Sequence, residues 1–157
     1  MKKILFAASE AVPFMKTGGL ADVTGSLPKY FDKKNYDVRV ILPKYVCMEE
    51  RWKGQLHFLC HFYVNLSWRK QYVGIFETTY DGITYYLVDN EFYFAGNAPY
   101  NNIYEDVEKF AFFSKAVLEA LPYLDFCPDI IHCHDWQTGL IPVYLKNEFQ
   151  ADSFYWG

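Results

Sequence analysis

The stretch KILFAASEAVPFMKTGGLADV, residues 3–23, decides the fold of this chain. Its first part, Lys3–Ala8, is a short apolar run bounded by polar residues, and such a run predicts a buried strand. The loop Ser9–Gly18 follows and ends in a pair of glycines. Beyond the loop, apolar residues recur at helical spacing and predict a helix: Leu20, Val23, Leu27 and Phe31.

A second apolar stretch, Asp37–Leu42, follows this helix and is closed by Pro43. Strand, helix and strand in succession form the βαβ unit of a parallel sheet, for which a right-handed crossover is the rule. The next part of the chain differs, because three strand-like runs are joined by short polar turns such as Asp81-Gly82. These runs predict an antiparallel insertion: His57–Leu66, Tyr72–Thr79 and Ile83–Val88.

The last part of the chain returns to the α/β pattern. Glu105–Leu121 predicts an amphipathic helix closed by Pro122, Asp129–Cys133 a third buried strand, and Thr138–Phe149 a helix with Pro142 in its first turn. The residues of the first helix that share an apolar stripe are Val107, Phe110, Ala111, Ser114, Val117, Leu118 and Leu121. The predicted fold class is therefore α/β: a Rossmann-like parallel sheet with helices on both faces and an antiparallel β insertion.

The composition fits one globular domain in a reducing compartment. Of 157 residues, 52% are hydrophobic, which suffices for a core, and the net charge of −4 argues against a nucleic-acid-binding protein. The dense aromatic residues, 14 Tyr and 14 Phe, are interpreted mainly as core, with a sugar-stacking face as the alternative. No cysteine belongs to a CxxC pair: Cys47, Cys60, Cys127 and Cys133. Because no apolar run has the length of a signal-peptide core or a membrane span, we expect a cytoplasmic protein.

The first candidate site is Lys16–Val23, which follows the first strand and opens the first helix. Its first four residues, Lys16–Gly19, form a glycine loop. Ligands of open parallel sheets bind outside the carboxyl ends of the strands, where this loop lies. The glycines let a ligand approach the backbone, and the helix start and Lys16 add positive charge that suits phosphate. The loop matches neither GxxxxGK[ST] nor GxGxxG. The alternative is a glycine helix start without a ligand, in which the helix dipole favours Asp22 as a first-turn carboxylate.

The second candidate site is HCHDWQTG, residues 132–139, where the predicted third strand ends. By the period of two, His132 and His134 lie on the same face of that strand. Metal binding is disfavoured, because no third and fourth ligands follow at the spacing of a zinc site. Asp135 is interpreted first as the N-cap of the next helix. The alternative is that Asp135 hydrogen-bonds sugar hydroxyls, with Trp136 packing nearby.

Glu10 is the third candidate, because this carboxylate directly follows the first strand and precedes the glycine loop. A carboxylate at the carboxyl end of a buried strand is placed to bind a hydroxyl of a ligand. A simply solvated carboxylate is the alternative, and residue spacing leaves both interpretations open.

Taken in order, these segments resemble bacterial glycogen synthases and plant starch synthases over nearly the whole chain. The string KTGGLADV, residues 16–23, is highly specific, whereas HDW at residues 134–136 is a weak signal by itself. The other matching segments are Ser9-Glu10, Pro13-Phe14, Gly25–Pro28, Asp37–Pro43 and Phe110–Ala116.

The resemblance implies the N-terminal half of a GT-B glycosyltransferase, in which two Rossmann-like domains face a cleft. This family transfers glucose from ADP-glucose to the non-reducing end of an α-1,4-glucan in glycogen biosynthesis, with retention of configuration and without a metal ion or other cofactor. The implied donor-binding residues are Lys16, Gly18 and Gly19. The implied residues of the sugar and acceptor pocket are Glu10, Asp22, Asp135 and Gln137, the last at a position where many relatives carry His.

On the same resemblance, residues 1–157 form a truncated N-terminal domain. The family continues into a catalytic histidine and a C-terminal nucleotide-binding domain, so we expect no catalytic residue and no activity in these residues alone. The implied partners are ADP-glucose, the α-1,4-glucan and the protein's own C-terminal domain, with neither nucleic acid nor membrane. Two alternatives stay open: another GT-B glycosyltransferase, and a non-catalytic glucan- or nucleotide-binding module.

Overall fold

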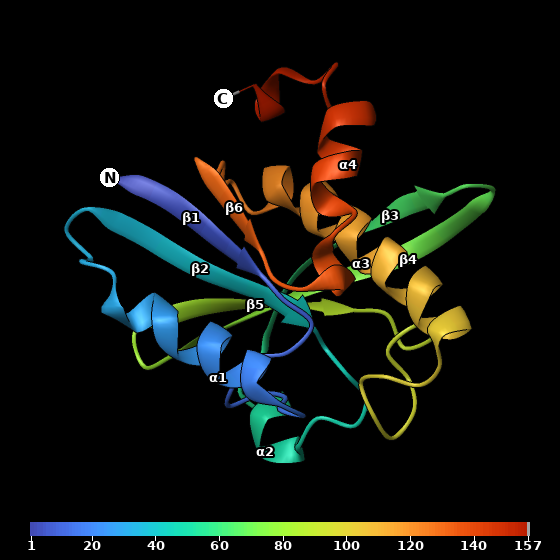
Figure 1. The fold of residues 1–157 in the computed structure, drawn as a ribbon, viewed down its shortest axis with the longest axis horizontal. Helices are drawn as coiled ribbons and strands as arrows, with labels where there is room; N and C mark the ends of the chain where they lie inside the picture. The colour runs from blue at the N-terminus through green and yellow to red at the C-terminus, as the bar shows by residue number, and fades with distance from the viewer. Residues whose placement is uncertain (157) are drawn as a thin grey trace.

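The computed structural model describes residues 1–156, which are built around a mixed β-sheet (Figure 1). Its six strands follow the order β3-β4-β5-β2-β1-β6 across the sheet. The strands are β1 Lys2–Ala7, β2 Tyr36–Pro43, β3 His57–Leu66, β4 Arg69–Tyr80, β5 Ile83–Asp89 and β6 Ile130–Cys133. The helices are α1 Gly19–Ser26, α2 Glu50–Lys53, α3 Ile103–Tyr123 and α4 Ile141–Asn147, with the short 3₁₀ turns η1 Leu27–Tyr30, η2 Trp136–Thr138 and η3 Ser153–Tyr155.

The strands β5, β2, β1 and β6 run parallel to one another, as predicted for β1, β2 and β6. The hairpin of β3 and β4 is antiparallel and extends the same sheet at the β5 side, which confirms the predicted insertion. β5, assigned to that insertion from the sequence, also pairs with β2 in parallel. The reason is the tight turn at Asp81 and Gly82, with φ of 54° and 76°, which returns the chain along β4 and beside β2.

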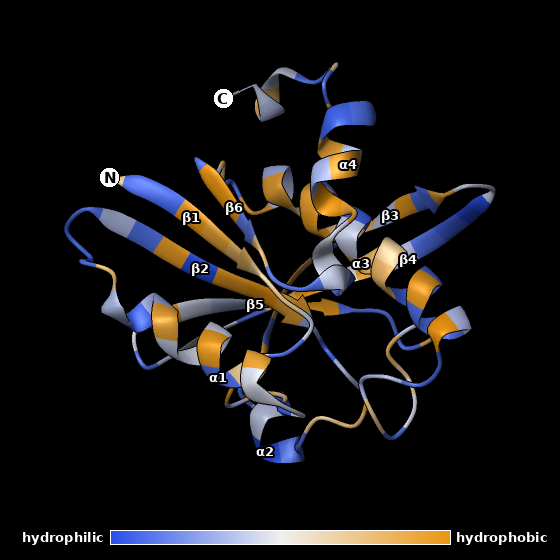
Figure 2. Cartoon of the chain, viewed as in Figure 1, coloured by the Kyte–Doolittle hydropathy of each residue, from blue (hydrophilic) through white to orange (hydrophobic). Residues whose placement is uncertain are grey.

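Helices cover both faces of the sheet, as predicted (Figure 1). On one face, Leu5 and Ala7 of β1 belong to the core that packs under α3 and α4. On the other face, Ile4 and Phe6 of the same strand pack with Phe14 and the residues around α2. Hydrophobic residues therefore gather along the central strands (Figure 2), because these strands are buried on both sides.

Only part of the apolar stripe predicted for the first helix faces the sheet: Phe31 packs against the core and Leu20 is partly buried, but the middle of the stripe is exposed. Val23 is 47% exposed and Leu27 38% exposed. The buried residues of α1 are the small ones, Ala21, Thr24 and Gly25. The physical reason is close approach: a Cβ at Gly25 would lie 2.3 Å from the Cγ2 of Val12, so this side of the helix accepts only small side chains.

Helix α3 begins after Asn102, whose side-chain oxygen accepts hydrogen bonds from the backbone N–H groups of Tyr104 and Glu105. It runs to Tyr123, so Pro122 lies in its last turn and does not end it at the predicted residue. Five of the seven predicted stripe residues are buried and Ala111 is partly so, but Val107 is 52% exposed. The buried face is wider than the stripe, since it also includes Phe112 and Phe113.

Among the described residues, the strand predicted to be buried near the end of the chain lies at the edge of the sheet. β6 pairs with β1 on one side only within residues 1–156, and Ile130 is 48% exposed. The helix predicted for residues 138–149 is divided into η2 and the shorter α4. Pro142 lies in the first turn of α4, as predicted, where its missing N–H breaks no helical hydrogen bond.

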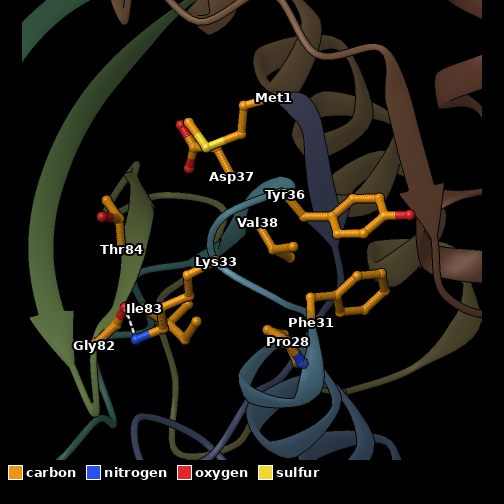
Figure 3. Close-up of a pocket in the computed structure, with 10 residues that line it drawn as sticks. All are labelled: Met1, Pro28, Phe31, Lys33, Tyr36, Asp37, Val38, Gly82, Ile83 and Thr84. Atoms are coloured by element: carbon orange, nitrogen blue, oxygen red, sulfur yellow. Dashed lines mark hydrogen bonds between the residues drawn. The ribbon is translucent and has the colours of Figure 1, made fainter.

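A cavity of about 170 Å³ lies at the amino ends of β2 and β5 (Figure 3). Its lining includes Asp37, Ile83 and Lys33, and the Lys33 amino group donates a hydrogen bond to the Gly82 carbonyl. This is the edge of the sheet opposite to the carboxyl ends, so the cavity includes none of the predicted site residues. Within residues 1–156, no helix has the length and apolarity that crossing a bilayer requires.

Candidate functional site

Glu10 follows β1, is buried, and holds the glycine loop by hydrogen bonds. Its side chain is enclosed, with the residue 1% exposed. One carboxylate oxygen accepts hydrogen bonds from the Thr17 hydroxyl at 2.5 Å and the Thr17 backbone N–H at 3.2 Å, and the other accepts from the Gly18 N–H at 3.2 Å. The solvated alternative for Glu10 is therefore wrong. Its carboxylate holds the turn of the loop.

Tyr100, which precedes α3, completes the environment of Glu10. The Tyr100 hydroxyl donates to a Glu10 carboxylate oxygen at 3.1 Å and lies 2.6 Å from the Ser9 hydroxyl. Burial raises the pKa of Tyr100 to about 12, and the nearby Glu10 adds to this, so the hydroxyl keeps its proton and remains a donor. Sequence reasoning missed Tyr100, because no local pattern marks a loop residue that meets its partner 90 positions away.

Lys16 and Asp22 face each other across the start of α1. The Lys16 amino group lies 2.8 Å from each carboxylate oxygen of Asp22. Both side chains are about half exposed, at 53% and 55%. The structure thus pairs Lys16, which is predicted to bind phosphate, with Asp22, which is predicted to bind sugar. Their ion pair lies on the surface of the loop.

Gly18 and Gly19 are not required by the fold of the described residues. Gly18 has an extended backbone with φ of −157°, and Gly19 also lies outside the left-handed region. A Cβ added at either position would meet no atom within 4 Å. Gly18 is the N-cap of α1 and offers no side-chain cap, so the first N–H groups of the helix receive no hydrogen bond from a capping side chain. This geometry leaves room for an anion beside Lys16.

Asp135 occupies the turn after β6. Its side-chain oxygen accepts a hydrogen bond from the Trp136 N–H at 2.7 Å, which confirms the predicted cap, although the element it caps is the 3₁₀ turn η2. The Asp135 backbone has φ of 63° and ψ of −177°, a region that residues other than glycine rarely adopt. Strain of this kind concentrates at functional sites, and here it aims a carboxylate outward from the carboxyl end of a strand.

Gln137 follows in η2 and is 6% exposed. Its backbone carbonyl accepts a hydrogen bond from the Ser114 hydroxyl of α3 at 3.2 Å, while its side-chain oxygen is buried without a partner among residues 1–156.

His132 and His134 share one face of β6 and the turn after it, as predicted, with ring centroids 4.4 Å apart. Burial, and then the neighbouring His132, lowers the pKa of His134 to about 4, so this imidazole is neutral near pH 7.

The two halves of the site lie at the ends of neighbouring strands. β1 and β6 are parallel partners, and the His134 N–H donates to the Ala7 carbonyl at 3.1 Å. Aromatic contacts also join them, because the ring of Phe110 lies 6.0 Å from Tyr100 and 5.5 Å from Trp136. The first half contains Glu10, Lys16, Gly18, Gly19 and Asp22, and the second contains Asp135 and Gln137. Within residues 1–156, no group of three or more metal-ligating side chains is placed to hold an ion.

Comparisons with known proteins identify the family of this chain. The family model of the starch synthase catalytic domain matches residues 3–156. A glycogen synthase of Lachnoclostridium phytofermentans is 67% identical over 157 residues, which are 100% of this chain and 33% of that protein. A glycogen synthase of Clostridium kluyveri is 51% identical over 155 residues, which are 99% of this chain and 32% of that protein.

Among solved structures, the catalytic domain of Starch Synthase IV from Arabidopsis thaliana, bound to ADP and acarbose, is similar to this chain. The TM-score is 0.79 at 31% sequence identity, across 94% of this chain and 30% of that chain. The predicted Rossmann-like α/β fold is thereby confirmed. The chain spans about a third of the length of the curated relatives it matches. Since the family model covers almost all of it, the chain belongs to the starch synthase catalytic domain family.

Proposed function

We propose that the protein containing this chain is a glycogen synthase. It transfers glucose from ADP-glucose to the non-reducing end of an α-1,4-glucan, with retention of configuration. The glycogen synthase relatives and the ADP-bound starch synthase neighbour support this function. In this proposal, residues 1–157 form the N-terminal, acceptor-side domain, and a C-terminal domain of the same protein binds the nucleotide across a cleft.

The observation that carries the proposal is the open glycine loop. Neither the backbone conformation nor the space around Gly18 and Gly19 requires a glycine in the described chain. Both lie at the start of α1, in the same loop as Lys16. A ligand that approaches the backbone closely explains glycine at both positions. A phosphate group is the ligand that free N–H groups, the helix dipole and a lysine favour together.

The transfer reaction places negative charge on the departing diphosphate. Lys16 meets this charge by exchanging its contact with Asp22 for one with a phosphate oxygen. The exchange costs little, because an ion pair with both partners half exposed contributes only a small free energy. Positive groups that are already in place where charge develops stabilise the transition state. Once Lys16 has moved to the phosphate, the carboxylate of Asp22 is free to accept hydrogen bonds from the sugar.

The remaining site residues divide into two roles. Asp135, which is exposed, supplies an acceptor oxygen for sugar hydroxyls at the end of β6, whereas Gln137, whose side-chain oxygen is buried, belongs to the wall of the sugar pocket. Glu10 instead acts through the loop, since its oxygens are already engaged by Thr17, Gly18 and Tyr100. We therefore place Glu10 at the sugar pocket as the group that shapes it.

The test uses the full-length protein with radiolabelled ADP-glucose and glycogen. We expect label in precipitable glucan, one ADP released per glucose transferred, and complete release of the label by an enzyme specific for α-1,4 linkages, as retention requires. Parallel reactions with UDP-glucose and without glucan serve as controls. Transfer only from a different sugar nucleotide would support another glycosyltransferase. Glucan binding without any transfer would support a non-catalytic module, and either result overturns the proposal.

We also propose that this enzyme acts in the cytoplasm, where glycogen and sugar nucleotides are made. The cysteines of the described chain are free thiols, which fits a reducing compartment: Cys47, Cys60, Cys127 and Cys133.

A further inference from the structure

The segment 95–102, which carries Tyr100 to the site, has little apolar packing apart from Pro99 and Tyr100. Pro99 is buried and Tyr100 partly buried, but the other residues of the segment are exposed. A cavity of about 430 Å³ lies beside the segment, lined in part by Gly96 and Asn101. A loop with few buried side chains and a cavity at its side needs polar contacts to adopt a single conformation.

Those contacts come from a buried ion pair on the first turns of α3. The amino group of Lys109 lies 3.1 Å from a carboxylate oxygen of Asp106, and the two side chains are only 3% and 7% exposed. Lys109 also donates to the Pro99 carbonyl at 2.9 Å. The two carboxylate oxygens of Asp106 each lie 3.1 Å from the Asn101 N–H. The pair therefore fixes the residue on each side of Tyr100.

A buried ion pair of this kind contributes little to stability by itself. Removing two charges from water costs free energy that their attraction only partly returns, so well-packed apolar residues of similar size would hold α3 equally well. The additional hydrogen bonds to the backbone on both sides of Tyr100 point to a role in positioning that apolar residues could not perform.

The positioning continues from Tyr100 to the glycine loop. Tyr100 donates to Glu10, and Glu10 accepts from the N–H groups of Thr17 and Gly18. We propose that Asp106 and Lys109 are positioning residues, which orient the glycine loop through Tyr100 and Glu10. The catalytic part of this inference rests on the proposed glucosyl transfer, whereas the structural part does not.

The structural part is tested by hydrogen–deuterium exchange in the full-length protein. In Lys109→Met, we expect exchange of the Thr17 and Gly18 N–H groups to become roughly tenfold faster or more, although neither residue contacts Lys109. Because this variant leaves the Asp106 carboxylate buried and alone, it risks unfolding the enzyme. The double variant Asp106→Asn/Lys109→Met leaves no lone buried charge and should show the same local effect.

The matched control is Lys115→Met on the same helix. Lys115 is also largely buried, at 13% side-chain exposure, and pairs with Glu148 instead of the loop. Any loss of stability that follows from removing a helix lysine appears in this control too, without faster exchange at Thr17 and Gly18. Equal exchange at these two groups in the double variant and the control would overturn the proposal.

Kinetics then tests the catalytic part. We expect kcat of the double variant to fall roughly tenfold or more, because small displacements of catalytic groups cost rate, while the KM for glucan changes much less. Faster exchange with unchanged kcat would show that the glycine loop is held by the pair but not used in catalysis, and would overturn the catalytic part. If the unmodified enzyme transfers no glucose, the proposed function fails, and the exchange data still decide the structural part.

Discussion

The amino group of Lys16 lies 2.8 Å from both carboxylate oxygens of Asp22, across the start of α1. Water reaches both partners, which are 53% and 55% exposed. An exposed pair of this kind contributes at most about 1 kcal/mol to stability. The pair is therefore easily opened by an arriving phosphate, and the fold should tolerate the loss of either partner.

Lys16→Gln in the full-length enzyme tests the phosphate contact. A charge-assisted contact to the departing diphosphate contributes on the order of 2–4 kcal/mol to the transition state, so kcat should fall roughly a hundredfold or more. The free energy of unfolding should change by less than about 1 kcal/mol, since the lost ion pair is exposed. Steady-state kinetics with varied ADP-glucose and denaturant unfolding measure the two effects.

Lys29→Gln is the control for this variant. Lys29 lies in η1, just beyond α1, and forms a comparable surface pair with Asp81. It should leave kcat unchanged. If Lys16→Gln weakens only the apparent affinity for ADP-glucose, then Lys16 acts in ground-state binding. If neither constant moves beyond a few-fold, Lys16 is not part of the site.

Glu10→Gln should damage both stability and activity. The substitution keeps the size of the side chain but replaces one acceptor oxygen by an NH₂ group, which opposes a donor of Thr17 or Gly18. We expect a loss of about 2–4 kcal/mol in the free energy of unfolding, because a buried donor loses its partner and hydrogen bonds lose their charge. The exposed Glu91→Gln is the control. Unchanged unfolding in both variants would contradict the buried network around Glu10.

Much of the fold follows from the sequence, because the apolar runs that form β1 and β2 are buried on both faces and leave little choice of structure. The errors arise where neighbours distant in sequence decide. Val23 and Leu27 have the spacing of a buried face, yet they are exposed, because close approach of Val12 to Gly25 turns the small side of α1 inward. The apolar sequence of β6 is that of a buried strand, whereas within residues 1–156 this strand lies at the edge of the sheet.

The candidate site divides in the same way. The glycine loop and Asp135 are predictable, since each follows a strand at the carboxyl edge of a parallel sheet. The burial of Glu10 is not, because it depends on Tyr100 and on the loop folding back over the carboxylate. The contact between Lys16 and Asp22 could not be predicted from the sequence either, because two residues six positions apart in a loop have no fixed separation in space.

The pH dependence of stability should contain a contribution from His134. Its pKa in the folded chain is about 4, against about 6.5 for an exposed histidine, so the unfolded chain binds the proton first. The contribution is fully present above pH 6.5 and is lost as the pH falls from there through 4. Because the imidazole is only partly buried, solvent screening limits it to on the order of 1–2 kcal/mol.

Denaturant unfolding at several pH values between 7.5 and 4 measures this contribution. His134→Gln should flatten the decline in stability below pH 6.5, whereas His57→Gln, at the exposed start of β3, should not. An identical decline in the wild-type protein and in His134→Gln would contradict the neutral, buried state of this imidazole.

Asp135 combines a cap with a strained backbone, and three substitutions separate these features from a contact with sugar. Asp135→Ala loses the hydrogen bond to the Trp136 N–H and keeps the unfavourable φ of 63°, so it should be less stable by about 1 kcal/mol. Asp135→Gly also loses the cap but relieves strain of about 1–3 kcal/mol, and should therefore be more stable than the alanine variant. Denaturant midpoints rank the two, and the reverse order would contradict the strain.

Asp135→Asn decides whether the carboxylate contacts sugar. Asparagine retains the capping oxygen, so the free energy of unfolding should change by less than about 0.5 kcal/mol. A hydrogen bond from a sugar hydroxyl to a neutral amide is weaker than one to a carboxylate, so kcat/KM for glucan should fall roughly tenfold. The matched control is Asp152→Asn, because Asp152 caps η3 through the Phe154 N–H at 2.9 Å and lies outside the site. If Asp135→Asn is as active as the control, Asp135 only caps η2 and does not contact the sugar.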